Sequence, residues 1–384
     1  MTSYAQSRAQ ERLVSLAGEG LDLPTFWCES TEILAPVVPH CMSPCWYTLD
    51  PASLLATSHY QAELEEIPPE LLAAEYYEED FHDMAGVARS EAGVSTLYEA
   101  TGGEPSRSRR WHANMQMGGD QELLLALRTR SGRAWGMLGL YREPGAPRFD
   151  EAELAFLRAV APSLADGAQR GLLVGEACDP EGPDAPGLVV LKADWSVDSV
   201  TPGVERWLAQ LPDGDWERGK LPAAVLAVAG RALRSAELPD APGEVAVARV
   251  LSKEGRWMVL HGASMVAGGA RRVAVIIEPA HPERIAPLLM AAYGMTEREQ
   301  EVTRLVLRGD STTQIAAALC VSPHTVQQHL KSVFEKTGVR SRRELVGRVF
   351  FAHYEPRLRD NERRVIGGRP VRGGPLGAPP RSSG

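Results

Sequence analysis

The chain has 384 residues, of which 44% are hydrophobic and 24% are charged, and its formal net charge is −9. This length indicates about two to three domains, and the composition excludes a wholly disordered or collagen-like chain. No apolar run approaches the roughly 18 residues that a membrane span needs, and the polar N-terminus lacks the apolar segment of a signal peptide. The five cysteines are few and odd in number, which does not suggest a disulfide framework. We therefore expect a soluble, cytoplasmic protein.

The charge is distributed unevenly along the chain. Residues 1–294 hold 25 basic and 41 acidic residues, a net charge of −16, whereas Met295–Phe351 carries +3 and Glu355–Gly384 carries +4. A basic C-terminal end behind an acidic body is typical of a nucleic-acid-binding module attached to another domain. The first of the five lysines is Lys192. A phosphate-cradling Gly-Lys-Ser/Thr loop and a phospho-receiver domain both need a lysine, so neither can lie before this residue.

Residues 1–175 are expected to form an α+β domain. The pattern predicts helices at Arg8–Leu16, Phe26–Ala35 and Ile67–Phe81 and short strands at Cys45–Leu49 and Leu54–Ser58. A polar loop is expected at Thr101–Arg110, followed by a hairpin of strands at Leu123–Arg130 and Ala134–Arg142. Asp150 and Glu153 resemble a capping box that begins a long helix. Pro162 is expected to kink or divide this helix.

Residues 176–187 are rich in Pro, Gly and acidic residues and are expected to be a linker. A second, smaller α+β domain is expected over residues 188–282. Its predicted elements are strands at Leu188–Leu191 and Ser196–Val200, helices at about Pro202–Leu211 and at Leu221–Leu233, and strands at Val245–Leu251, Trp257–Leu260 and Val273–Glu278. The Gly-, Pro- and Arg-rich residues 355–384 are expected to be a disordered tail.

Between these segments, residues 288–353 contain four short predicted helices. Thr296–Glu299, Ser311–Gln314 and Ser341–Glu344 each have the spacing of a capping box, and Ser322-Pro323 supplies an N-cap followed by a first-turn proline. Gly309 and Gly338 are expected to end the first and third helices. Four short helices joined by tight turns predict an all-α helix-turn-helix domain.

The predicted third helix has two distinct faces. Its apolar stripe, which must pack against the other helices, consists of Val326, Leu330, Val333 and Phe334. Its separate polar face consists of His324, Gln327, Gln328 and Lys331. A helix that reads the major groove needs one buried face and one face that offers side chains to base edges. A merely solvated face is the alternative, but the short helix and turn before it favour DNA binding.

Met295–Val349 resembles the C-terminal DNA-binding domain of LuxR-type transcriptional regulators. The matching residues are Thr296-Glu-Arg-Glu-Gln-Glu-Val302, Gly309, Ile315-Ala316, Val321-Ser322, Thr325-Val326, His329-Leu330, Lys336, Gly338-Val339-Arg340-Ser341 and Glu344-Leu345. The resemblance implies that the third helix enters the major groove, with base contacts from Gln327, Gln328 and Lys331. It also implies phosphate contacts from Thr325, Arg340 and Ser341. Gln327 departs from the usual lysine, so the resemblance does not fix the operator sequence.

A looser resemblance links residues 1–175 to the GAF-like sensor of actinobacterial-type LuxR regulators. It rests on Thr48-Leu-Asp-Pro51, Trp135-Gly136, Leu140-Tyr-Arg142 and Phe149–Arg158, and residues 188–282 resemble a PAS-like domain more faintly. The expected function is sequence-specific transcription regulation, in which residues 1–280 sense an unknown signal or mediate dimerisation. In the alternative, these domains only dock or dimerise and bind no small molecule. Expected partners are double-stranded DNA and a second copy of the chain, with RNA polymerase and a small-molecule effector as further candidates.

Three other features of the sequence have a structural and a functional interpretation. His40 and Cys41 could form a metal or redox site with Cys45, and Cys28 is a further candidate, but a free cysteine is more often a small core residue, and no metal or cofactor is expected. Four tryptophans are more often core residues than pocket residues: Trp111, Trp135, Trp195 and Trp257. No Gly-x-Ser-x-Gly, His-Glu-x-x-His or Cys-x-x-Cys motif is present, so an enzyme is not expected.

Overall fold

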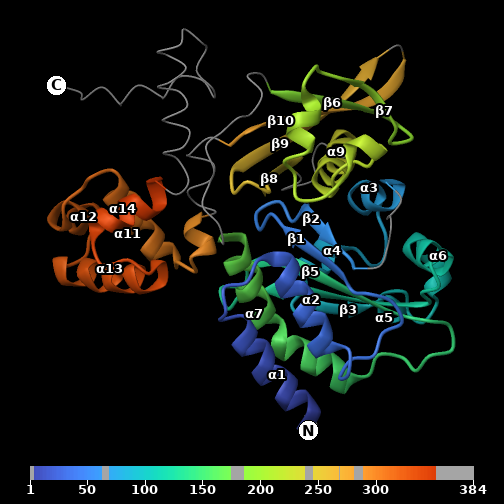
Figure 1. Cartoon of the computed structure of the whole chain (residues 1–384), viewed down its shortest axis with the longest axis horizontal. Helices are drawn as coiled ribbons and strands as arrows, with labels where there is room; N and C mark the ends of the chain where they lie inside the picture. The colour runs from blue at the N-terminus through green and yellow to red at the C-terminus, as the bar shows by residue number, and fades with distance from the viewer. Residues whose placement is uncertain are drawn as a thin grey trace. The chain divides into compact units, whose positions relative to one another are not determined.

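The computed structural model describes residues 4–62, 69–173, 186–237, 245–267, 269–280 and 289–351 (Figure 1). The chain divides into two compact units: Met1–Val174, Gly187–Lys253 and Met258–Ile277 form the first, and Gly175–Pro186, Glu254–Trp257 and Glu278–Gly384 form the second. We call the first the N-terminal unit. The tail expected at 355–384 and most of the linker expected at 176–187 lie outside the described residues. No described helix is both long and apolar enough to cross a bilayer.

The N-terminal unit contains two five-stranded sheets. In the first, the strand order is β2-β1-β5-β4-β3 and the hydrogen-bonded neighbours are antiparallel. Its strands are β1 (Cys45–Leu49), β2 (Ala56–Tyr60), β3 (Val94–Thr96), β4 (Gln121–Arg128) and β5 (Ala134–Arg142). Gly136 of β5 lies so close to β1 that an added Cβ would be 2.6 Å from the Tyr47 carbonyl oxygen. Only glycine permits this approach.

Alternate residues of the first sheet pack against different helices, because side chains along a strand point to opposite faces. Leu123, Leu125 and Leu138 share a core with α1 (Tyr4–Leu16), α2 (Leu23–Leu34) and α7 (Glu151–Leu173). On the opposite face, Tyr47 and Tyr141 belong to a core that includes residues of α3 (Pro69–Tyr77) and α4 (Met84–Arg89). The sheet is therefore covered on both faces.

The structure differs from one expectation for this region. The segment expected as a polar loop at Thr101–Arg110 contains the 3-10 helix η1 (Pro105–Arg107) and the start of α6 (Arg109–Gln116), after the short α5 (Leu97–Ala100). The Ser108 hydroxyl and the Arg110 backbone N–H donate to Asp80 Oδ2, at 3.0 and 3.1 Å, a long-range contact that local patterns cannot indicate. Pro162 lies inside α7 without dividing it, and Leu157 and Leu164 on its two sides are buried in the same core.

The second sheet repeats the strand order of the first. It runs β7-β6-β10-β9-β8, so both sheets follow the order second, first, fifth, fourth and third. Its elements are β6 (Gly187–Lys192), β7 (Val197–Val200), α8 (Val204–Leu208), α9 (Ala223–Glu237), β8 (Val247–Leu251), β9 (Trp257–Ala267) and β10 (Ala270–Pro279), with the 3-10 helix η2 (Trp216–Arg218) between the two helices. The expected strands and helices are confirmed, although β9 is longer and α8 shorter than predicted. Every residue of α9 from Ala223 to Leu233 is buried.

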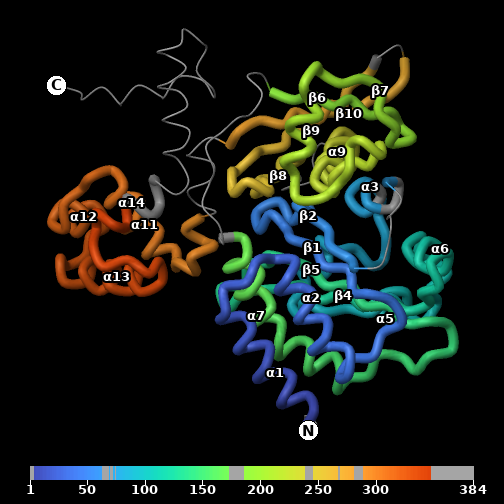
Figure 2. Tube along the Cα trace, in the orientation of Figure 1, coloured from blue at the N-terminus to red at the C-terminus, as the bar shows by residue number. Residues whose placement is uncertain are grey.

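Buried side chains from both sheets of the N-terminal unit belong to one hydrophobic core. Helix α3 lies against α9 (Figure 2), and an added Cβ at Gly230 would be 2.4 Å from the Ala73 carbonyl oxygen. The buried carboxylate of Asp50, in the turn between β1 and β2, forms an ion pair of 2.6 Å with Arg249 of β8. This shared core was not predicted, since sequence patterns report only local structure.

The described C-terminal helices are α11 (Glu297–Leu307), α12 (Thr312–Ala318), α13 (Pro323–Thr337) and α14 (Arg342–Phe351). Their buried side chains form a separate core, in which Val302, Ile315, Val326 and Leu345 each come from a different helix. Each of these helices overlaps a helix predicted for this region. The predicted fold class is confirmed in its coarser form: two antiparallel sheets with helices are followed by a helical domain.

Candidate functional sites

Helices α12 and α13 form the helix-turn-helix. Ser311 accepts a hydrogen bond from the Gln314 backbone, and the Gln314 side chain accepts one from the Ser311 backbone, which completes a capping box. Ser322 caps α13 by accepting from Thr325 N at 3.0 Å. Between the helices, Cys320 adopts a left-handed conformation with a φ of 53°. These caps begin the two helices where the sequence predicts.

The apolar stripe of α13 fixes the orientation of this helix. Val326, Leu330 and Val333 are buried against α11 and α12, and Phe334 is partly buried beside them. The opposite face must therefore point to solvent. This is the side of α13 on which the predicted base-contacting residues lie.

The structure brings the predicted polar residues together on that exposed face: His324, Gln327, Gln328 and Lys331 are all exposed. The Gln328 Nε2 and His324 Nε2 atoms lie 3.1 Å apart. Gln328 Nε2 can donate to this ring nitrogen when the imidazole is neutral with its proton on Nδ1. This contact orients the amide of Gln328 and leaves its Oε1 and one N–H available for another partner.

The predicted phosphate-contacting residues differ in their surroundings. Arg340 is exposed, and its backbone N–H donates to Glu344 Oε2 at 2.9 Å. Thr325 and Ser341 are half-buried, and their hydroxyl groups serve helix caps. Thr325 Oγ1 lies 2.9 Å from Ser322 Oγ, and Ser341 Oγ donates to Glu344 Oε1 at 3.1 Å. Of these three, Arg340 has the most accessible side chain.

Glu299 has a structural role in this domain beyond the helix cap that the sequence predicts. Besides the Thr296 backbone N–H, its carboxylate accepts from Ser332 Oγ and from Lys336 Nζ of α13, both at 2.6 Å. Burial opposes the charged form, but Lys336, Ser332 and Thr296 outweigh burial and lower the pKa of Glu299. Lys336, which also donates to the Gly294 carbonyl oxygen at 2.9 Å, is thus committed to holding α13 against α11.

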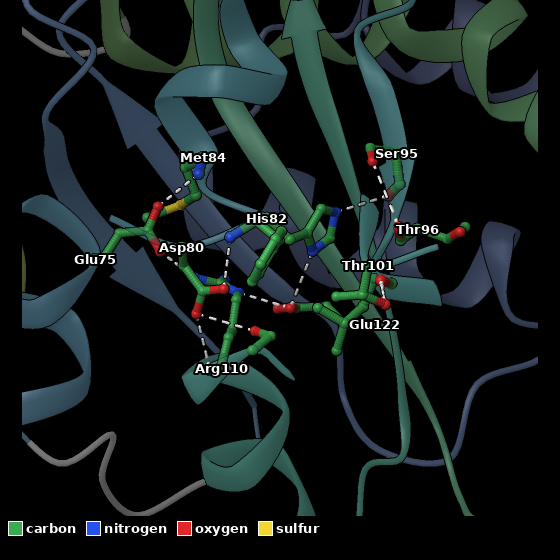
Figure 3. A network of polar contacts seen from close by, with 12 residues as sticks. Glu75, Asp80, His82, Met84, Ser95, Thr96, Thr101, Arg110 and Glu122 are labelled. Atoms are coloured by element: carbon green, nitrogen blue, oxygen red, sulfur yellow. Dashed lines mark hydrogen bonds and ion pairs between the residues drawn. The ribbon is translucent and has the colours of Figure 1, made fainter. Parts of the chain in front are cut away.

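A second site lies in the N-terminal unit, where charged side chains are buried together (Figure 3). Arg110 of α6 forms ion pairs with Glu75 of α3 and with Glu122 of β4. The Glu122 Oε2 atom is 2.6 Å from Arg110 Nε and 3.4 Å from His82 Nδ1. Asp80 accepts hydrogen bonds from Ser108 and Arg110 at the start of α6, and these bonds hold this short helix next to the network.

The two carboxyl groups of this network differ in pKa. Burial raises the pKa of Glu75 to about 7, although Arg110 opposes the shift. Burial also acts to raise the pKa of Glu122, but Arg110 and His82 outweigh it and lower this pKa to about 2. Arg110 thus favours the ionised form of Glu122, whereas burial favours the protonated form of Glu75.

The other candidate residues lie apart from this network or on its edge. Cys45 is buried and its thiol donates to Gln61 Oε1 at 3.0 Å, whereas Cys28 and Cys41 are exposed. Within the described ranges, no group of three His, Cys, Asp or Glu residues could hold a metal ion. Trp135 is a core residue, and the Trp111 indole N–H donates to Asp120 at 2.9 Å.

Comparison with known proteins identifies the class of the C-terminal domain. Residues 294–349 match the family model described as bacterial regulatory proteins, luxR family. Together with the geometry of α12 and α13, this match shows that these residues form a LuxR-type helix-turn-helix domain.

Two curated relatives are similar to a short part of the chain. Mb0914c of Mycobacterium bovis, whose name places it among the HTH-type transcriptional regulators, is 50% identical over 52 residues, which is 14% of this chain and 6% of the relative. The HTH-type transcriptional regulator MalT of Serratia proteamaculans is 36% identical over 66 residues, which is 17% of this chain and 7% of the relative. The chain thus spans only a small fraction of the length of both relatives.

Among solved structures, the bacteriophytochrome RpBphP3 from the photosynthetic bacterium R. palustris is similar to the chain at 13% identity. The similarity covers 73% of this chain and 63% of that chain, with a TM-score of 0.29. A TM-score this low does not establish the fold of the N-terminal unit.

Proposed function

We propose that the protein is a sequence-specific transcription regulator of the LuxR type, which binds double-stranded DNA with α13 in the major groove. The observation that carries this proposal is the division of α13 into a buried stripe and an exposed polar face. A recognition helix needs both, since the core must hold it while its other face reaches the bases. The match of residues 294–349 to LuxR-family regulators supports the same role.

In this proposal Gln327, Gln328 and Lys331 contact base edges. A glutamine amide can bind adenine with two hydrogen bonds, using its oxygen and one N–H. The contact with His324 leaves these two groups of Gln328 available, so His324 acts by orienting Gln328. Lys331 can reach guanine or a phosphate.

Arg340, Thr325 and Ser341 are the proposed phosphate contacts. Arg340 contributes its exposed charge, whereas Thr325 and Ser341 lie at the starts of α13 and α14, where helix N-termini favour anions. Such contacts hold the domain on the duplex without reading its sequence. The charge of the domain, +3 over Met295–Phe351, supports this role.

We infer that the protein acts as a homodimer in the cytoplasm, because one short helix reads too few base pairs for useful specificity. The N-terminal unit, with its GAF-like and PAS-like sheets, senses a signal or mediates dimerisation, and RNA polymerase is a further partner. The function is regulatory rather than enzymatic, and it needs no cofactor. The shared strand order of the two sheets supports two related sensor-type folds. In the alternative, the N-terminal unit docks a protein partner and binds no small molecule.

Selection from a pool of random DNA duplexes by the full-length protein tests this function. A homodimeric helix-turn-helix protein enriches a two-fold symmetric motif whose half-sites lie about one helical turn apart or a multiple of it. A motif with a single half-site would contradict the dimer. Recovery of no motif would contradict sequence-specific binding itself.

A further inference from the structure

A hollow opens between the first sheet and the helices α3 and α6. Its cavity volume is about 90 Å³, and its empty space reaches about 800 Å³ when the open mouth is included. The apolar part of its lining consists of Met42, Leu72, Met84 and Met117. Methionine side chains are flexible and polarisable, which suits them to contact a flat organic molecule.

The sheet side of the hollow carries two tyrosines and one cysteine. Tyr47 of β1 and Tyr141 of β5 are each 4% exposed and line the cavity beside Cys45. Burial raises the pKa of the Cys45 thiol to about 12, so the thiol stays protonated at neutral pH and does not act as a nucleophile. A protonated thiol is also a weak hydrogen-bond acceptor. The tyrosine hydroxyls beside it can therefore turn to a better acceptor that enters the cavity.

Asn114 supplies a polar group that has no hydrogen-bond partner among the described residues. It lines the cavity from α6, its residue is 5% exposed, and its Nδ2 atom makes no hydrogen bond with any residue that the structure describes. A buried amide without a partner costs free energy, because it has lost its hydrogen bonds to water. An occupant with a hydrogen-bond acceptor removes this cost.

The charges around the hollow exclude anions. Its lining includes four carboxyl groups, on Glu75, Glu78, Asp80 and Asp83, and two guanidinium groups. Both guanidinium groups already have carboxylate partners: Arg109 pairs with Glu78, and Arg110 pairs with Glu75 and Glu122. An anion would meet excess negative charge and no free cation among these lining residues.

We propose that this hollow binds an uncharged organic molecule that is about the size of one aromatic ring and carries a hydrogen-bond acceptor, held by Tyr47, Tyr141 and Asn114. The enclosed volume of about 90 Å³ is smaller than the roughly 150 Å³ of a cavity that holds benzene, so a bound ring lies partly in the open mouth. The binding deepens the sensing role in the proposed function. Binding is measured without DNA, so its failure leaves the DNA-binding proposal standing.

Helix α3 contacts both the hollow and helix α9, which packs with the second sheet. Leu72 and Glu75 of α3 line the hollow, while Ala73 and Tyr76 of the same helix face α9. An added Cβ on Gly230 of α9 would be 3.2 Å from the Tyr76 Cβ, so α3 and α9 are in close contact. A molecule that orders α3 therefore acts on the packing of α9.

Three probes of equal shape and different charge test the proposal: benzamide, benzamidinium and benzoate. Binding of each to the full chain is measured at neutral pH by ligand-observed NMR. We expect benzamide to bind, because its carbonyl oxygen can accept hydrogen bonds from Asn114 and the tyrosine hydroxyls. Benzamidinium has no acceptor and benzoate is an anion, so neither should bind as well as benzamide. If benzamide does not bind, or if either of the other two binds as well as benzamide does, the proposal is wrong.

Two variants locate the probe. Asn114→Leu and Tyr141→Phe each remove one polar group from the cavity while keeping the size of the side chain, and each should weaken binding about fivefold or more. Tyr98→Phe is the matched control: its hydroxyl donates to Asp120 at 2.8 Å outside the cavity, so probe binding should not change. Unchanged binding in both cavity variants, with the fold intact by circular dichroism, would place the probe elsewhere and overturn the assignment.

Discussion

Gln328 is the side chain on which base reading depends most in the proposed complex. Its alanine variant should lose about 1–3 kcal/mol of affinity for the selected duplex, because two hydrogen bonds to one base are removed. Affinity for a random duplex should stay the same. Fluorescence anisotropy with both duplexes measures the difference, and an equal loss on both would contradict a base contact.

Arg340 should behave in the opposite way, because phosphates are alike in every sequence. Arg340→Ala should weaken binding to selected and random duplexes alike and should reduce the slope of log affinity against log salt by about one. Titration at several salt concentrations measures this slope. An unchanged slope would remove Arg340 from the phosphate contacts.

His59 is predicted to titrate abnormally. Its ring lies 4.8 Å from the ring of Tyr47, and its Nε2 atom is buried with no hydrogen-bond partner among the described residues. Burial, and then the charge of Lys220, lower the pKa of His59 to about 4. The unfolded chain therefore binds this proton more readily, and the stability contributed by His59 is lost as the pH falls from 6.5 to about 4.

A His59→Phe variant isolates this effect while keeping a ring beside Tyr47. The free energy of unfolding of the wild type should fall relative to that of the variant by roughly 2–3 kcal/mol over this pH window. Denaturant unfolding of both proteins near pH 7 and near pH 4 provides the comparison. A difference that does not change with pH would show that His59 has an ordinary pKa.

At the scale of elements, the recognition helix depends on the buried carboxylate of Glu299. Lys336→Met removes the 2.6 Å ion pair with this carboxylate and should lower the local stability of α13 by roughly 1–3 kcal/mol. Hydrogen exchange of α13 amides in the full chain reports this change. Lys331→Met, on the exposed face of the same helix, is the matched control and should affect DNA binding without affecting exchange. Equal protection in both variants would contradict the role of Lys336.

The elements most readily predicted from sequence were those with local signals. Thr296, Ser311 and Ser322 cap helices where the spacing indicates, and the stripe containing Val326 is buried as the helical period requires. The polar face of α13 was likewise predicted from spacing alone. Its role in DNA binding stays a prediction.

The features that sequence could not provide depend on contacts between distant residues. The pairing of Glu299 with Lys336 joins residues in different helices, and Arg110 meets Glu75 across a long stretch of chain. No local pattern distinguishes such a buried arginine from a solvated one. The cavity was missed for the same reason, since its lining comes from two strands, three helices and the loops between them.

At the scale of the whole molecule, the ion pair of Asp50 with Arg249 holds the two sheets of the N-terminal unit together. Arg249→Met leaves the buried carboxylate without its partner and should cost roughly 3–5 kcal/mol of stability. Arg272→Met breaks a more exposed pair, in which Arg272 Nε is 3.1 Å from Asp198, and should cost less than about 1 kcal/mol. Calorimetry of the full chain compares them, and equal costs would contradict a special role for Asp50.

The proposed function of the whole protein depends on sequence-specific binding of double-stranded DNA by the helix-turn-helix. The most direct test is the dissociation constant of the full-length protein for its selected duplex and for a scrambled duplex of the same length and composition, at physiological salt. We predict at least about a thousandfold preference for the selected duplex, which base contacts from α13 provide. Equal affinities would mean that only phosphate contacts hold the DNA, and the proposed regulatory function would then be wrong.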